Sequence, residues 1–251
     1  MCLVLFAYQA HPVYKLIVAA NRDEFLQRPT AQAHFWEDEP NLLAGRDLEK
    51  MGTWMGVTKS GRFSAITNYR DPNEITEGKQ SRGQLVKDAL TFHGEIAEYM
   101  KRLQQTDSNF PGYNLLVGDS NSLYYYSNVG KSLEKVKPGI HGLSNHLLNT
   151  NWPKVKKGKE GLEQVIKGEN VIENLFELLQ DTDRPDDKFL PKTGLSLEWE
   201  RILSPLFIQT NGYGTRSSTV FLMSDTEIQY VERTFSNEGK SNQAFHFQIQ
   251  S

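Results

Sequence analysis

Cys2 is the only cysteine among the 251 residues, and it directly follows the initiator methionine. Methionine is normally removed when the second residue is small, which would leave Cys2 with a free α-amino group. Such an amine has an ordinary pKa of about 8, close to about 8.5 for a thiol, so one residue supplies both a nucleophile and its general base. A lone cysteine at this place is, however, more often a small buried residue that begins a strand. The residues around Cys2 therefore decide between the two interpretations.

Four polar residues, Asn21-Arg22-Asp23-Glu24, follow the apolar run 16–20. A guanidinium from Arg22 beside Cys2 would lower the pKa of the thiol or bind a substrate carboxylate. Asp23 would hold the α-ammonium group or orient the thiol. An ion pair at the end of a surface hairpin is the ordinary alternative for these residues, so the tetrapeptide alone is weak evidence.

Polar residues in three later segments are further candidates. Asn145, which follows a strand-like run at 139–144, has an amide that can stabilise a developing oxyanion, and His146 beside it would line the same pocket. Arg216 stands before the apolar run 220–223 and would bind a carboxylate or support the nucleophile. Asn68 and Asn21 are candidate substrate-binding residues together with His146. A turn asparagine and a solvated charge at a strand end are the ordinary alternatives.

The elements that must position these residues are short β-branched and aromatic runs, which predict strands over 3–8, 14–20, 53–58 and 62–67. A hairpin turn centred between His11 and Pro12 brings residue 2 opposite residue 21 or close to it. Arg22 and Asp23 would then lie beside Cys2.

The rest of the chain predicts helices and then strands again. Ser81 is a candidate capping residue for a helix with apolar positions 85, 86, 89 and 90, and further helical patterns cover 96–103 and 152–180, the latter broken near Gly168. We expect a surface loop over 181–191 and strands over 113–117, 123–126, 217–223, 227–233 and 244–249. This order predicts an α+β protein with largely antiparallel sheets, forming one domain over residues 1–251.

Several separated motifs, taken together, resemble the Asn-Arg-Asp-Glu family, also called the Transport and Golgi Organisation protein two family. Besides Met1-Cys2 and the tetrapeptide they are 52–56 (GTWMG), 67–70 (TNYR), 142–145 (GLSN) and 214–218 (GTRSS). The resemblance covers essentially the whole chain. It implies a four-layer αββα sandwich of the N-terminal-nucleophile (Ntn) hydrolase type, related to penicillin V acylases and conjugated bile acid hydrolases.

In those acylases an N-terminal cysteine attacks a C–N amide bond. The resemblance assigns the corresponding catalytic places to Cys2, Arg22, Asp23, Asn145 and Arg216, and a weaker place to Asn68. No segment matches the acylases' substrate loops, so the site chemistry is expected to be shared more closely than the substrate.

A second hypothesis is a non-catalytic carrier for haem or another hydrophobic carboxylate, because the family is associated with haem mobilisation and lipid metabolism. Arg22 and Arg216 would then pair with ligand carboxylates. A third is an interaction protein whose ancestral pocket has decayed. The first two hypotheses expect a small-molecule substrate or ligand, and the third expects a protein partner. None of them expects a metal site or a resident cofactor.

Charge and hydropathy exclude other classes of function. Lys and Arg number 28 against 31 Asp and Glu, for a net charge of −3, which does not suit a nucleic-acid-binding surface. No run approaches the roughly 20 apolar residues of a transmembrane helix, and no phosphate-binding glycine loop is present. The single cysteine and the lack of a signal peptide favour the cytoplasm.

Overall fold

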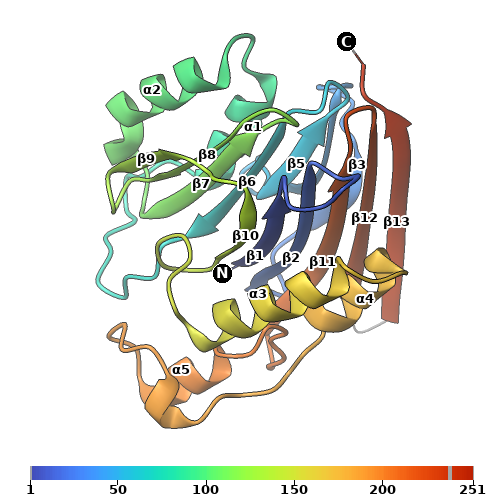
Figure 1. The fold of residues 1–251 in the computed structure, drawn as a ribbon. Helices are drawn as coiled ribbons and strands as arrows, with labels where there is room; N and C mark the ends of the chain where they lie inside the picture. The colour runs from blue at the N-terminus through green and yellow to red at the C-terminus, as the bar shows by residue number, and fades with distance from the viewer. Residues whose placement is uncertain (1, 237–238, 251) are drawn as a thin grey trace.

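The computed structural model describes residues 2–236 and 239–250. Two antiparallel sheets form the centre of the molecule (Figure 1). The first contains, in spatial order, β10 (Gly139–Leu143), β1 (Cys2–Tyr8), β2 (Leu16–Phe25), β11 (Tyr213–Met223), β12 (Glu227–Ser236) and β13 (Gly239–Gln248). The second contains β3 (Thr30–Phe35), β4 (Leu42–Asp47), β5 (Met55–Thr58), β6 (Phe63–Asn68), β7 (Tyr113–Gly118), β8 (Leu123–Ser127) and β9 (Ser132–Lys135).

Helices cover the outer face of each sheet and complete four layers (Figure 1). The seven-stranded sheet carries α1 (Arg82–Thr91) and α2 (Ile96–Thr106), followed by the short helix η1 (Asp107–Asn109). The six-stranded sheet carries α3 (Pro153–Val165) and α4 (Val171–Leu179). The connection back to β11 contains η2 (Asp187–Phe189) and α5 (Leu197–Ile202). The fold is therefore the predicted αββα sandwich.

Side chains alternate between the two faces of β1, and both faces are covered, so every residue of this strand is buried. Cys2, Val4, Phe6 and Tyr8 point into the core between the two sheets, and the residues between them pack against α3 and α4. Across the inter-sheet core, Phe63 of β6 stacks on Phe221 of β11 with ring centroids 5.3 Å apart. Cys2 thus stands at the end of a strand that is buried on both faces.

The strands predicted from β-branched and aromatic runs are confirmed, as are the helices over α1 to α4 and the break after residue 165. Ser81 is the N-cap residue of α1, as predicted, although its hydroxyl makes no capping hydrogen bond. The first hairpin pairs Cys2 with Arg22, one residue further along than residue 21. A shift of one residue exchanges the two faces, so Arg22 shares the face of Cys2 and Asn21 does not.

Several elements have no counterpart in the sequence prediction. Strands β3 and β4 contain few large apolar residues and pair with a register shift, and β9 is a short polar edge strand. Helix α5 has six residues and η2 has three, and both lie in the segment between α4 and β11. Their positions depend on tertiary contacts that a local pattern does not encode.

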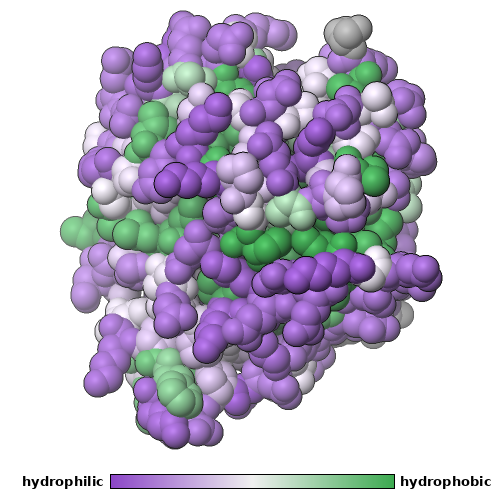
Figure 2. Space-filling view, viewed as in Figure 1, coloured by the Kyte–Doolittle hydropathy of each residue, from purple (hydrophilic) through white to green (hydrophobic). Residues whose placement is uncertain are grey.

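The surface in Figure 2 is largely hydrophilic, with a narrow band of hydrophobic side chains running across this face above α3 and α4. Within the described part of the chain, no helix is both long and apolar enough to cross a membrane.

Candidate functional site

The β1–β2 and β2–β11 pairings bring the candidate catalytic residues to one end of the six-stranded sheet. Cys2 lies opposite Arg22, and Asp23 lies opposite Thr215 on β11. Neighbouring residues on a strand face opposite sides, so Arg22 points toward the space between the sheets and Asp23 toward the helical layer. The Asp23 carboxylate accepts a hydrogen bond from the Thr215 hydroxyl at 2.7 Å. The sequence prediction that these three residues are neighbours is thus met by the geometry.

All three side chains are buried, and burial dominates their electrostatics. Burial raises the pKa of the Cys2 thiol, and the negative charge of Asp23 adds to that rise, while the positive charge of Arg22 and a hydrogen bond from the Asp23 backbone oppose it. Burial likewise raises the pKa of Asp23, and the charge of Lys154 and the Thr215 hydrogen bond oppose it. The thiol at rest is therefore protonated near neutral pH, and a reaction at its sulfur needs a base.

Cys2, Arg22, Asp23 and Asn68 line a common cavity of about 600 Å³ at the open end of the sandwich. Its walls also contain cationic side chains from other elements, namely Arg28, Arg46, Lys50, Lys79 and Arg82. The acidic side chains in the wall are fewer: Asp23, Glu24 and Asp47. Arg28 pairs with Asp47 at 2.7 Å, and Arg46 pairs with Asp38 at 2.6 Å, so two of these cations are already neutralised. The cavity as a whole favours an anionic or polar ligand.

Two glycines explain how α1 reaches this cavity. A Cβ atom on Gly52 would lie 2.6 Å from the carbonyl carbon of Gly83, and the Thr53 amide donates to the Gly83 carbonyl at 3.2 Å. The backbones before β5 and at the start of α1 therefore touch, which only glycine permits. This contact places Arg82 and Gly83 in the cavity wall, a role of the 52–56 motif that sequence reasoning did not identify.

Asn145 lies behind the cavity wall. Its side-chain amide donates to the Asn68 carbonyl at 3.0 Å, and its own carbonyl accepts from the Arg70 amide at 2.7 Å. The preceding Ser144 hydroxyl donates to the Cys2 carbonyl at 3.3 Å. These bonds join the ends of β10, β6 and β1, so Asn145 fixes the position of Asn68 relative to Cys2.

The other three candidates lie outside the Cys2 cavity. Arg216 sits at a bulge in β11, lines a separate cavity, and its guanidinium donates to the carbonyls of Phe25 and Leu26 at 3.2 and 3.0 Å and also to that of Arg28. Asn21 is buried on the helical side, where it donates to the carbonyls of Leu179 and Leu206 at 2.8 and 2.9 Å. His146 hydrogen-bonds Tyr69 and Thr150, each at 2.9 Å. The structure thus places these three side chains where they join segments of the fold.

Sequence reasoning missed Lys154, in the first turn of α3. Its side chain is buried, and its ammonium donates to the Leu203 carbonyl at 3.1 Å. Burial lowers the pKa of Lys154 to about 8, while the charges of Asp23, Cys2 and Glu200 oppose that shift and Arg70 adds to it. In the same region Arg70 and Glu200 form a buried ion pair at 2.7 Å. No sequence signal separates Lys154 from the exposed lysines of the same helix.

The fold is an αββα sandwich of the Ntn-hydrolase type. The structure is similar to a Caenorhabditis elegans N-acylethanolamine-hydrolyzing acid amidase ortholog, with a TM-score of 0.53, 10% identity and coverage of 88% of this chain and 92% of that chain. It is also similar to a mutant of conjugated bile acid hydrolase from Clostridium perfringens, with a TM-score of 0.53, 9% identity and coverage of 100% and 97%. At such low identity the likeness concerns the fold.

The relatives found by sequence are more similar to this chain than these two structures are. The family model described as Transport and Golgi organisation 2 matches residues 1–237. The Homo sapiens Transport and Golgi organization protein 2 homolog is 30% identical with all of both chains covered, and the Bos taurus homolog is 33% identical with 93% of each covered. The chain therefore belongs to the Transport and Golgi organisation 2 family, which confirms the resemblance found in its motifs.

Proposed function

We propose that this protein is a C–N amide hydrolase in which Cys2, exposed by removal of Met1, is the nucleophile. The observation that carries the proposal is the pairing of Cys2 with Arg22 at the wall of a cavity of about 600 Å³. Both fold neighbours are named as hydrolases, one of them as an amidase. A buried cysteine without a cavity beside it would not support this function.

The raised pKa of the Cys2 thiol determines how the proton moves. The thiol must lose its proton as Sγ attacks the carbonyl carbon, and the α-amine of Cys2 takes it. The C–N bond then breaks, and the departing nitrogen receives that proton from the α-ammonium group. Water next attacks the thioester, the α-amine accepts a proton from this water, and the thiol is restored as the carboxylic acid leaves.

The neighbouring side chains take supporting roles in this proposal. Arg22 stabilises negative charge that develops at the sulfur and at the substrate. Asp23, on the adjacent position of β2, holds the α-ammonium group. Asn68, which lies in the cavity wall, supplies a side-chain amide for the oxyanion, and Asn145 positions it through the 3.0 Å hydrogen bond to its backbone carbonyl.

A labelling experiment tests the nucleophile. Intact mass spectrometry first establishes that Met1 is absent, and the processed protein is then treated with a thiol-directed acylating probe. Because Cys2 is the only cysteine, a thioester adduct can form at one site only. We expect labelling of the wild type, none of Cys2→Ala, and labelling slowed about tenfold or more in Arg22→Gln.

Lys135→Gln, which removes an exposed charge on β9 outside the cavity, is the control and should label at the wild-type rate. A processed wild-type protein that stays unlabelled while its denatured form reacts would rule out Cys2 as a nucleophile.

The cationic cavity wall also favours a second function, the non-catalytic binding of haem or another hydrophobic carboxylate. Arg22 is in this cavity and Arg216 is not, so Arg22→Ala should weaken a saturable Soret shift more than Arg216→Ala does. Absence of any Soret change on haem addition would remove this candidate.

A further inference from the structure

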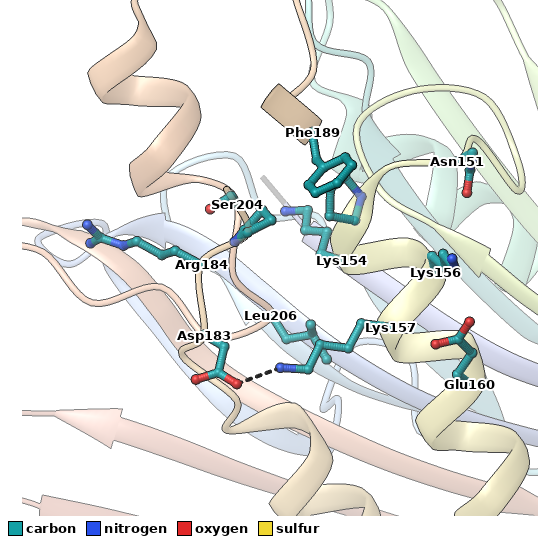
Figure 3. A pocket seen from close by; sticks show the side chains of 12 residues that line it. Asn151, Lys154, Lys156, Lys157, Glu160, Asp183, Arg184, Phe189, Ser204 and Leu206 are labelled. Carbon is teal, nitrogen blue, oxygen red and sulfur yellow. Dashed lines mark hydrogen bonds and ion pairs between the residues drawn. The ribbon is translucent and has the colours of Figure 1, made fainter. Parts of the chain in front are cut away.

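A second cavity, of about 480 Å³, lies between α3 and the segment 183–206 (Figure 3). Its size is within the range of about 300–1,000 Å³ that small-molecule sites occupy. None of the residues considered for the hydrolase chemistry lines it apart from the buried Lys154. It is therefore a separate site.

Basic side chains outnumber acidic side chains in the wall of this cavity. Lys157 is neutralised, because its ammonium lies 2.9 Å from the Asp183 carboxylate (Figure 3) and also pairs with the carboxylate of Asp181, which is outside the cavity wall. The other basic residues in the wall are Lys154, Lys156 and Arg184, against Glu160 as the remaining acid. Among the described residues, neither Lys156 nor Arg184 takes part in an ion pair.

Lys154 stands at the inner end of the cavity. One of the three N–H donors of its ammonium goes to the Leu203 carbonyl, and the residue is only 4% exposed. A charged group held in such a dry position gains more from an anion than an exposed lysine does.

The cavity also has an apolar part. Leu206, Pro153, Pro185 and the phenyl ring of Phe189 line it (Figure 3). Phe189 is 58% exposed, which is unusual for a large aromatic side chain. A ligand with an apolar chain would cover this ring.

We propose that this cavity binds an amphipathic anion, with its carboxylate or phosphate directed toward Lys154, Lys156 and Arg184 and its apolar chain against Phe189. The inference does not depend on the chemistry at Cys2.

Isothermal titration calorimetry on the full chain tests the site with four ligands of equal chain length: octanoate, octyl phosphate, octylamine and 1-octanol. We expect binding of at least one of the two anions, and the one that binds more tightly identifies the head group. The double variant Lys156→Gln/Arg184→Gln should weaken that binding about tenfold, and Phe189→Ser about fivefold. All three residues are exposed, so these variants should fold.

The matched control is Lys101→Gln/Arg102→Gln on α2, which removes the same two charges outside the cavity and should bind like the wild type. Equal affinity for octylamine or 1-octanol, or failure of both anions to bind, would overturn the proposal. So would anion binding that survives the Lys156→Gln/Arg184→Gln changes and is lost in Arg22→Gln, because the anion would then occupy the Cys2 cavity.

Discussion

Lys154 is the residue whose ionisation the fold perturbs in the most measurable way. Its ammonium is enclosed between α3 and the segment that contains Leu203, and burial lowers its pKa to about 8 from the ordinary 10.5. The charge of Asp23 acts in the opposite direction but does not cancel this cost. The charge of Lys154, in the region behind Cys2, therefore changes with pH around this value.

The sign of that linkage follows from proton counting. Between pH 8 and 10.5 the unfolded chain keeps a proton on Lys154 that the native chain has lost, so stability from this residue increases as pH rises through the window. The gain is up to about 3 kcal/mol. We expect Lys154→Met to lack this increase and Lys135→Met, an exposed control, to retain it, as measured by chemical denaturation at several pH values. Equal slopes in all three proteins would show that Lys154 is not desolvated.

For single residues, the sequence predicted correctly which side chains come together when a single hairpin sets their positions. Cys2, Arg22 and Asp23 are local to β1 and β2, so strand pairing alone brings them together. Arg82 reaches the Cys2 cavity, and Lys154 reaches the region behind Cys2, only through contacts between distant segments. A buried lysine and an exposed one have the same sequence signal, and packing decides between them.

Among the elements, the connection from β2 to β3 depends on one side chain from β11. The bulge at Arg216 lets its guanidinium reach the carbonyls of Phe25, Leu26 and Arg28. The sequence predicted Arg216 at the start of a strand but could not predict the bulge, which arises where the pairing of β11 with β2 shifts by one residue between Thr215 and Ser217.

Arg216→Gln should therefore loosen this connection. Loss of the guanidinium removes the donor to the Leu26 carbonyl, while the carbonyls of Phe25 and Arg28 keep bonds from the Arg28 amide and the Thr30 hydroxyl. We expect a destabilisation of about 1–3 kcal/mol. Hydrogen exchange should rise in residues 25–30 and stay unchanged in β7 and β8. Arg102→Gln, an exposed substitution of the same type on α2, is the control. Unchanged exchange in residues 25–30 would mean that the backbone holds this connection without Arg216.

For the whole molecule, strands and helices with strong periodicity were enough to predict an α+β protein with largely antiparallel sheets, and the motif resemblance added the four layers. The segment between α4 and β11 was not predicted in detail, because its helices are short and its position depends on single long-range contacts. One of these is the ion pair between Arg70, which follows β6, and Glu200 in α5. Glu200 also accepts hydrogen bonds from the Thr193 amide and hydroxyl at 3.1 and 2.5 Å. This contact fastens the segment that encloses Lys154.

Breaking one side of this pair should be costly, since it leaves a buried charge without its partner. We expect Glu200→Leu to lower the free energy of unfolding by about 3–5 kcal/mol, and the double variant Arg70→Met/Glu200→Leu to recover most of that loss. Glu198→Leu, at an exposed position of the same helix, should have a small effect. Chemical denaturation of the wild type, Arg70→Met, Glu200→Leu, the double variant and the control measures the coupling. If the losses of the two single variants simply added in the double variant, the charges of Arg70 and Glu200 would be independent, and the segment 183–206 would be held by its apolar contacts instead.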